Sequence, residues 1–75
     1  MKVEITGEYI ILSQFLKKLE LCQTGGMAKF FVKIHNIRIN DRIAEGRNAK
    51  IRVGDTVWID DNIYIIVAKK QYSFA

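Results

Sequence analysis

The hydrophobic pattern of this chain changes its period twice, and these two changes limit the folds it can adopt. Between Ser13 and His35 apolar residues recur at helical spacing, whereas on both sides they alternate with polar residues or cluster as β-branched and aromatic ones. The pattern predicts one strand, two helices and then four strands, with no proline to mark boundaries. An order in which helices and strands are segregated is typical of the α+β class.

The helical stretch divides at residues 23–26, where Gln-Thr-Gly-Gly interrupts the period. Ser13 is expected to cap the first helix and Thr24 the second, which spans residues 27–35. A broad apolar arc, which includes Phe30, predicts that the second helix is mostly buried. Asn36 is expected to end it in the left-handed conformation that asparagine tolerates.

The remaining segments predict five short strands, over residues 3–6, 37–40, 50–53, 56–59 and 63–67. Asp60, Asp61 and Asn62 have the composition of a hairpin turn between the last two. A chain of 75 residues buries a thin core, so we expect a single domain over residues 1–75.

Positive charge is concentrated in the middle of the chain. Residues 13–52 hold nine Lys or Arg and three Asp or Glu, whereas the two flanks together hold three basic and five acidic residues. A basic face attracts polyanions at long range, so this distribution predicts a nucleic-acid partner.

Several classes of function are disfavoured. The chain has one cysteine, Cys22, and one histidine, His35, at opposite ends of the second helical segment and therefore about 20 Å apart. They cannot form a nucleophile and base, and neither type is numerous enough for a metal cluster. We therefore expect no enzyme, metal or cofactor. We also expect no membrane partner and a cytoplasmic location, because no apolar run is long enough to span a bilayer and no signal-like segment opens the chain.

A phosphate-binding surface is the alternative that the residues favour. Gly25 and Gly26 leave bare backbone at a helix N-terminus, where an anion can approach closely, although they could also serve only as a tight turn. If the segment after residue 40 folds back beside the second helix, its basic residues and Lys29 and Lys33 form one concave surface. We expect the aromatic residues to be packed inside, which disfavours base stacking and favours recognition of phosphates and shape.

Four segments of the chain resemble the S4 RNA-binding domain. They are Leu-Ser-Gln-Phe-Leu-Lys-Lys from Leu12, Thr-Gly-Gly-Met-Ala-Lys-Phe-Phe from Thr24, Ile-Arg-Ile-Asn-Asp from Ile37 and Lys-Ile-Arg-Val-Gly-Asp-Thr-Val from Lys50. The resemblance covers about residues 10–60, and the glycine-rich stretch is most similar to the small stand-alone S4 proteins of the YaaA type.

The resemblance implies an αL-type S4 fold, in which two short helices pack on a small bent antiparallel sheet and RNA lies against the second helix, the next strand and the loop. It implies a non-enzymatic, monomeric protein that binds structured RNA, with ribosomal RNA as the expected class. The residues assigned to RNA binding are Lys17, Lys18, Thr24, Gly25, Gly26, Lys29, Lys33, Arg38, Arg42, Arg47, Lys50 and Arg52.

Two other functions remain open at this point. One is a protein-interaction adaptor, which would be favoured if Lys29 and Lys33 form salt bridges to Glu20 or Glu45. The other is a DNA-associated factor.

Overall fold

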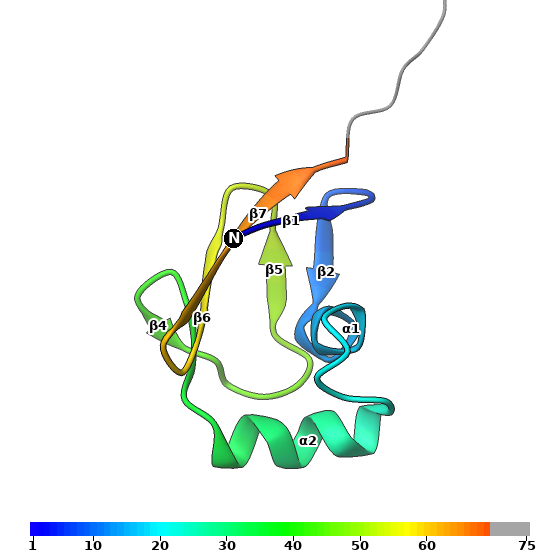
Figure 1. The fold of residues 1–75 in the computed structure, drawn as a ribbon, viewed down its shortest axis with the longest axis vertical. Helices are drawn as coiled ribbons and strands as arrows, with labels where there is room; N and C mark the ends of the chain where they lie inside the picture. The colour runs from blue at the N-terminus through cyan, green and yellow to red at the C-terminus, as the bar shows by residue number, and fades with distance from the viewer. Residues whose placement is uncertain (70–75) are drawn as a thin grey trace, which may run out of the picture.

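A computed structural model describes residues 1–69 of the chain, so the last part of the expected domain, residues 70–75, lies outside the described residues. The elements follow the expected order, with two additional short strands (Figure 1). They are β1 (Lys2–Ile5), β2 (Tyr9–Ile11), α1 (Leu12–Lys18), α2 (Gly25–Ile34), β3 (Ile37–Ile39), β4 (Arg42–Ile43), β5 (Lys50–Arg52), β6 (Thr56–Ile59) and β7 (Asn62–Ala68).

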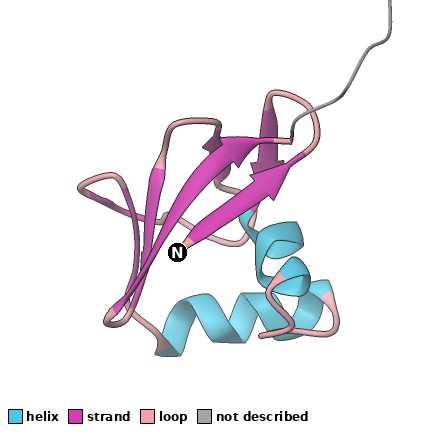
Figure 2. Ribbon diagram, turned by 45° about the horizontal axis from the view of Figure 1, so that its top comes forward, coloured by secondary structure: helices cyan, strands magenta, loops and turns pink. Residues whose placement is uncertain are grey.

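The strands form two sheets rather than one. The larger sheet has the order β1-β7-β6-β3-β4, and β2 and β5 form a separate pair. The expected antiparallel arrangement has one exception, because β1 runs parallel to β7, with Lys2 beside Ile65 and Ile5 beside Ala68. The other strand pairs are antiparallel. The α+β class is confirmed: Figure 2 shows the helices together on one side and the strands on the other.

The two strands missing from the sequence prediction are β2 and β4, which have three and two residues. β2 is apolar or aromatic at all three positions and β4 has only two residues, so neither shows the alternation that would reveal a strand. The predicted hairpin turn is confirmed, since Ile59 pairs with Asn62 across Asp60 and Asp61. A second two-residue turn joins β3 to β4, where Asn40 adopts a left-handed φ of 53°.

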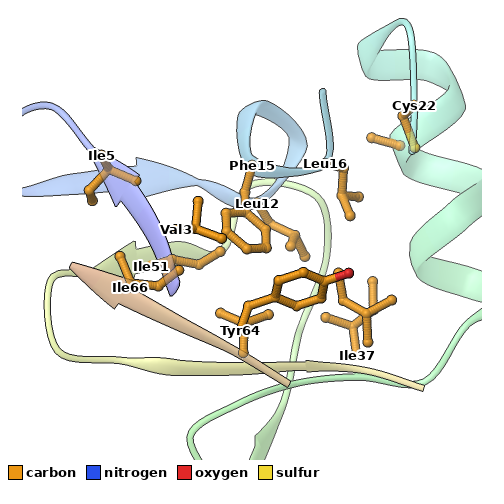
Figure 3. Close-up of a cluster of buried hydrophobic side chains, with 13 residues drawn as sticks. Val3, Ile5, Leu12, Phe15, Leu16, Cys22, Ile37, Ile51, Tyr64 and Ile66 are labelled. Atoms are coloured by element: carbon orange, nitrogen blue, oxygen red, sulfur yellow. The ribbon is translucent and has the colours of Figure 1, made fainter. Parts of the chain in front are cut away.

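One cluster of apolar side chains fills the space between the helices and the strands (Figure 3). Phe15 of α1 meets Tyr64 of β7 edge to face, with ring centroids 5.8 Å apart. Leu12 and Leu16 of α1 and Ile51 of β5 are fully buried beside them. The core therefore joins α1 to strands of both sheets, and this packing fixes the position of the two sheets relative to each other.

The two helices start and end differently from one another. Thr24 caps α2 as predicted, because its hydroxyl accepts a hydrogen bond from the Met27 amide at 3.2 Å. Ser13 does not cap α1; the cap position is Ile11, which makes no side-chain cap. Asn36 is not left-handed either, since α2 passes through an extended His35 (φ −110°) directly into β3.

Neither helix in residues 1–69 is long and apolar enough to cross a membrane.

The prediction that α2 is mostly buried is wrong. Ala28 is its one fully buried residue, whereas the side chains of Phe30 and Ile34 are 66% and 76% exposed. The helix lies along one end of the fold (Figure 1), so α1 and the strands cover only one side of it. The apolar arc of α2 is wider than the side of the helix that α1 and the strands cover, so part of the arc is exposed to solvent.

Candidate nucleic-acid interface

The loop of residues 44–49, between β4 and β5, is held against the starts of both helices. The amides of Leu12 and Ser13, at the start of α1, donate to the carbonyls of Ala49 and Arg47 at 2.8 and 2.9 Å. These bonds satisfy amides that a helix start leaves unpaired, which explains why α1 needs no side-chain cap. The Arg47 guanidinium in turn donates to the Gly25 carbonyl of α2 at 3.0 Å. The loop therefore folds back beside the second helix, which is the condition for a joint cationic surface.

A groove of about 710 Å³, open to solvent, lies between this loop and α2. We call it the helix groove. Its cationic side chains are Lys29 and Lys33 from the helix and Arg47 from the loop, and its acidic one is Glu45. Lys29 and Lys33 are four residues apart, so both project from the same side of α2. The full lining is Lys29, Val32, Lys33, Ala44, Glu45, Gly46, Arg47, Asn48 and Ala49.

A second groove, of about 620 Å³, adjoins the first and shares Ala44, Glu45 and Ala49 with it. We call it the strand groove. It brings together cationic residues from β4 and β5, namely Arg42, Lys50 and Arg52. The full lining is Ile39, Asn40, Arg42, Ile43, Ala44, Glu45, Ala49, Lys50, Arg52 and Asp55.

The two grooves together hold six cationic side chains and two acidic ones. The Asp55 carboxylate is already engaged, since it accepts hydrogen bonds from the Arg52 amide at 2.8 Å and the Asn40 side chain at 3.1 Å. Within residues 1–69 the one contact of salt-bridge length joins His35 to Asp60, so no acidic residue there lies within salt-bridge distance of Lys29 or Lys33. The salt bridges that would favour the adaptor function, to Glu20 or Glu45, are not formed in this part of the chain.

Thr24, Gly25 and Gly26 lie at the start of α2, beside Arg47. Neither glycine has a positive φ, and the left-handed residue in the turn between the helices is Glu20, with φ of 62°. The turn therefore does not require these glycines. A Cβ atom on Gly26 would meet nothing closer than the Thr24 hydroxyl, at 3.8 Å, so the backbone here is open to solvent.

Thr24, Gly25 and Gly26 line neither groove, and three of the predicted cationic site residues also lie away from both. Arg38 alternates with the inward-facing Ile37 and lines a hollow of about 230 Å³ beside Trp58, on the other face of the larger sheet. Lys17 and Lys18 are exposed in the last turn of α1 and line neither groove. The structure thus gathers six of the predicted cations in the grooves and separates three from them.

The expectation that the aromatic residues are packed inside is correct for Phe15 and Tyr64 but wrong for others. Phe30 is exposed on α2, and Trp58 is 39% exposed on β6. Tyr9 was not among the residues singled out from the sequence. It is 46% exposed, and the Lys50 ammonium lies over its ring, 4.9 Å from the centroid. Tyr9 follows Gly7 and Glu8 in a segment whose strand character was not recognised, so no sequence pattern placed it beside Lys50.

Cys22 and His35 have structural roles. Cys22 is buried, and burial raises the pKa of its thiol because desolvation disfavours the thiolate. His35 stacks on Phe31, with 4.0 Å between ring centroids, and its Nδ1 lies 2.7 Å from an Asp60 carboxylate oxygen. No group of three or more His, Cys, Asp or Glu residues within residues 1–69 is placed to hold a metal ion.

The fold and the two grooves together define a small α+β protein with a cationic surface that is formed by a helix, a loop and strands. Residues 3–67 match the sequence profile of the S4 domain, and the chain belongs to the S4 domain family. No solved structure matches the chain significantly.

A curated relative is also similar over most of the chain. It is a probable ribosome maturation protein, RlbA, of Bacillus subtilis strain 168. The two are 43% identical over 58 residues, which cover 77% of this chain and 82% of the relative.

Proposed function

We propose that this chain is a non-enzymatic RNA-binding protein that recognises structured ribosomal RNA through its phosphates and its shape. The observation that carries the proposal is the pair of adjoining open grooves, in which six cationic side chains from α2, β4, β5 and the loop converge. Cations without ion-pair partners are free to replace the counterions of a nucleic acid, which is the main source of affinity in such complexes.

The geometry favours a structured partner over an extended single strand. The cations come from elements that meet at different angles, so they suit a backbone that follows a defined three-dimensional path. Duplex RNA presents such a path, with phosphates and 2′-hydroxyls along a wide, shallow minor groove.

The link to the ribosome rests on the relative, which is named a probable ribosome maturation protein. Because this chain shares 43% of aligned residues with that relative over most of both chains, we propose that it also acts in ribosome maturation and that the RNA it binds there is ribosomal. We further propose that residues 1–75 act as one monomeric S4-like unit in the cytoplasm, without metal or cofactor.

Charge reversal tests the helix groove directly. Lys29 and Lys33 are exposed, so K29E/K33E should change the free energy of unfolding by no more than about 0.5 kcal/mol per site. Its affinity for a labelled ribosomal RNA hairpin should fall about tenfold or more, because two phosphate contacts become repulsions. The matched control is K2E/K69E, which makes the same charge change at exposed residues outside both grooves. An equal loss in both variants would show that net charge, not the groove, determines binding.

Competition distinguishes the alternatives. Structured RNA should displace the labelled hairpin at lower concentration than duplex DNA of equal length, because duplex DNA in solution is B-form and has no 2′-hydroxyls. Equal competition would favour a DNA-associated factor. Full affinity in K29E/K33E would favour a protein-interaction adaptor.

A further inference from the structure

Tyr9 lies at the margin of the cationic surface, on the exposed face of the β2–β5 pair. It is directly opposite Arg52 in the register, and Lys50, two residues before Arg52, lies on the same face. The Lys50 ammonium is 4.9 Å from the Tyr9 ring centroid, while Lys50 and Arg52 also line the strand groove. Tyr9 therefore continues the strand groove with a flat aromatic surface.

The core does not require an aromatic ring at this position. Ile10, the next residue of β2, packs against the core opposite the fully buried Ile51, whereas the Tyr9 side chain remains 46% exposed. An aromatic ring with two cations beside it combines the two components that bind unpaired nucleotides. The ring offers a face on which a base can stack, and the cations attract the flanking phosphates.

We propose that Tyr9 stacks on an unpaired base of the RNA while Lys50 and Arg52 hold the adjacent phosphates. The proposal rests on the proposed function and deepens it, since it specifies RNA in which a helix is interrupted by a bulged or looped nucleotide. In a fully paired helix the bases are stacked on each other and offer no free face to Tyr9.

Two RNA hairpins of equal length test the proposal. One contains a single bulged 2-aminopurine, whose fluorescence is quenched when it stacks, and the other is fully paired. Stacking on a side chain contributes enough that Y9L should bind the bulged hairpin about tenfold more weakly than the native chain. Y9F keeps the ring, so its affinity should fall no more than about twofold. Both variants should bind the paired hairpin within about twofold of the native chain, and quenching should be lost in Y9L alone.

Trp58→Leu provides a matched control. Trp58 is also a partly exposed aromatic residue opposite an arginine, Arg38, but it lies on the face of the larger sheet away from the grooves. W58L should therefore bind the bulged hairpin with native affinity. Thermal unfolding of each variant shows whether its fold is intact.

The outcomes separate this inference from the proposed function. Native affinity and quenching in Y9L would overturn the stacking site, as would an equal loss on both hairpins, which would mean that Tyr9 only positions Lys50. If the native chain bound neither hairpin, the proposed function would itself fail. Tight binding of the paired hairpin with no preference for the bulge would retain the proposed function and reject the stacking site.

Discussion

Arg47 is the residue on which the geometry of the helix groove depends most. Its carbonyl accepts from the Ser13 amide of α1, and its guanidinium donates to the Gly25 carbonyl of α2. It therefore fastens the loop of residues 44–49 between the two helices while contributing a charge to the groove. A single side chain thus has a structural and an electrostatic role.

Substitution at Arg47 should separate these roles. Arg47→Met removes the hydrogen bond to Gly25 and the charge, so the free energy of unfolding should fall by about 0.5–1.5 kcal/mol and RNA affinity should also fall. Arg47→Lys keeps the charge without the arginine donor geometry, so it should lose similar stability but less affinity. Urea unfolding and RNA titration of both variants measure the two effects. Native stability in R47M would show that the loop is held without this side chain.

Among the elements, the end of α2 and the β6–β7 hairpin are joined by Asp60. Its carboxylate meets His35 at 2.7 Å and accepts from the Asn36 amide at 3.1 Å, and its own amide donates to the Asn36 carbonyl at 2.8 Å. The hydrogen bond with His35, followed by that from Asn36, lowers the pKa of Asp60. This contact holds the end of α2 against the β6–β7 hairpin, directly before the chain enters β3.

The lowered pKa of Asp60 makes this contact dependent on pH. Because the folded-state pKa lies below the unfolded value of about 3.9, its contribution to stability is complete above that value. It is lost as the pH falls through the lower, folded-state pKa. Asp60→Asn should therefore be less stable than the native chain near pH 6, and the difference should begin to shrink as the pH falls below about 4. Urea unfolding across this range checks it.

Asp61→Asn is the control for that experiment. The Asp61 carboxylate makes no hydrogen bond within residues 1–69, although it lies in the same turn. D61N should keep the native dependence of stability on pH. A D60N variant that remained equally destabilised at pH 3 would show that the amide substitution perturbs packing and not charge.

At the scale of the whole molecule, the cationic surface exists only because two sheets and two helices meet around one core. The core places α2 and the strands so that their cations face the same loop from two sides. Affinity for RNA should then depend on several weak contacts acting together. No single lysine or arginine is expected to account for most of it.

Salt dependence measures how many of these contacts form. If four or five phosphates are neutralised, the logarithm of the association constant should fall against the logarithm of salt concentration with a slope of roughly −3 to −4. Titrations of a ribosomal RNA hairpin at several salt concentrations give the slope directly. K29E/K33E should reduce its magnitude by about 1.4 to 1.8, whereas a slope near zero in the native chain would contradict electrostatic binding.

Local chemistry determined much of this protein from the sequence alone. The helical and alternating periods located both helices and five of the seven strands within residues 1–69. Thr24 capped α2, and Asp60 and Asp61 formed the predicted turn. These features depend on residues a few positions apart, so a short stretch of sequence contains the information. The concentration of basic residues in the middle of the chain can likewise be seen in the sequence without knowledge of the fold.

Contacts between distant segments decided the rest. Alternation shows that Arg38 and Arg52 each face away from buried neighbours, but β3 and β5 belong to different sheets, so only Arg52 reaches a groove. In the same way, the apolar arc of α2 does not reveal how much surface is available to cover it, and Phe30 is left exposed. A periodic pattern specifies which residues share a face of an element. Which faces meet depends on the path of the whole chain, and that path brought Tyr9 beside Lys50 and Arg47 beside Gly25.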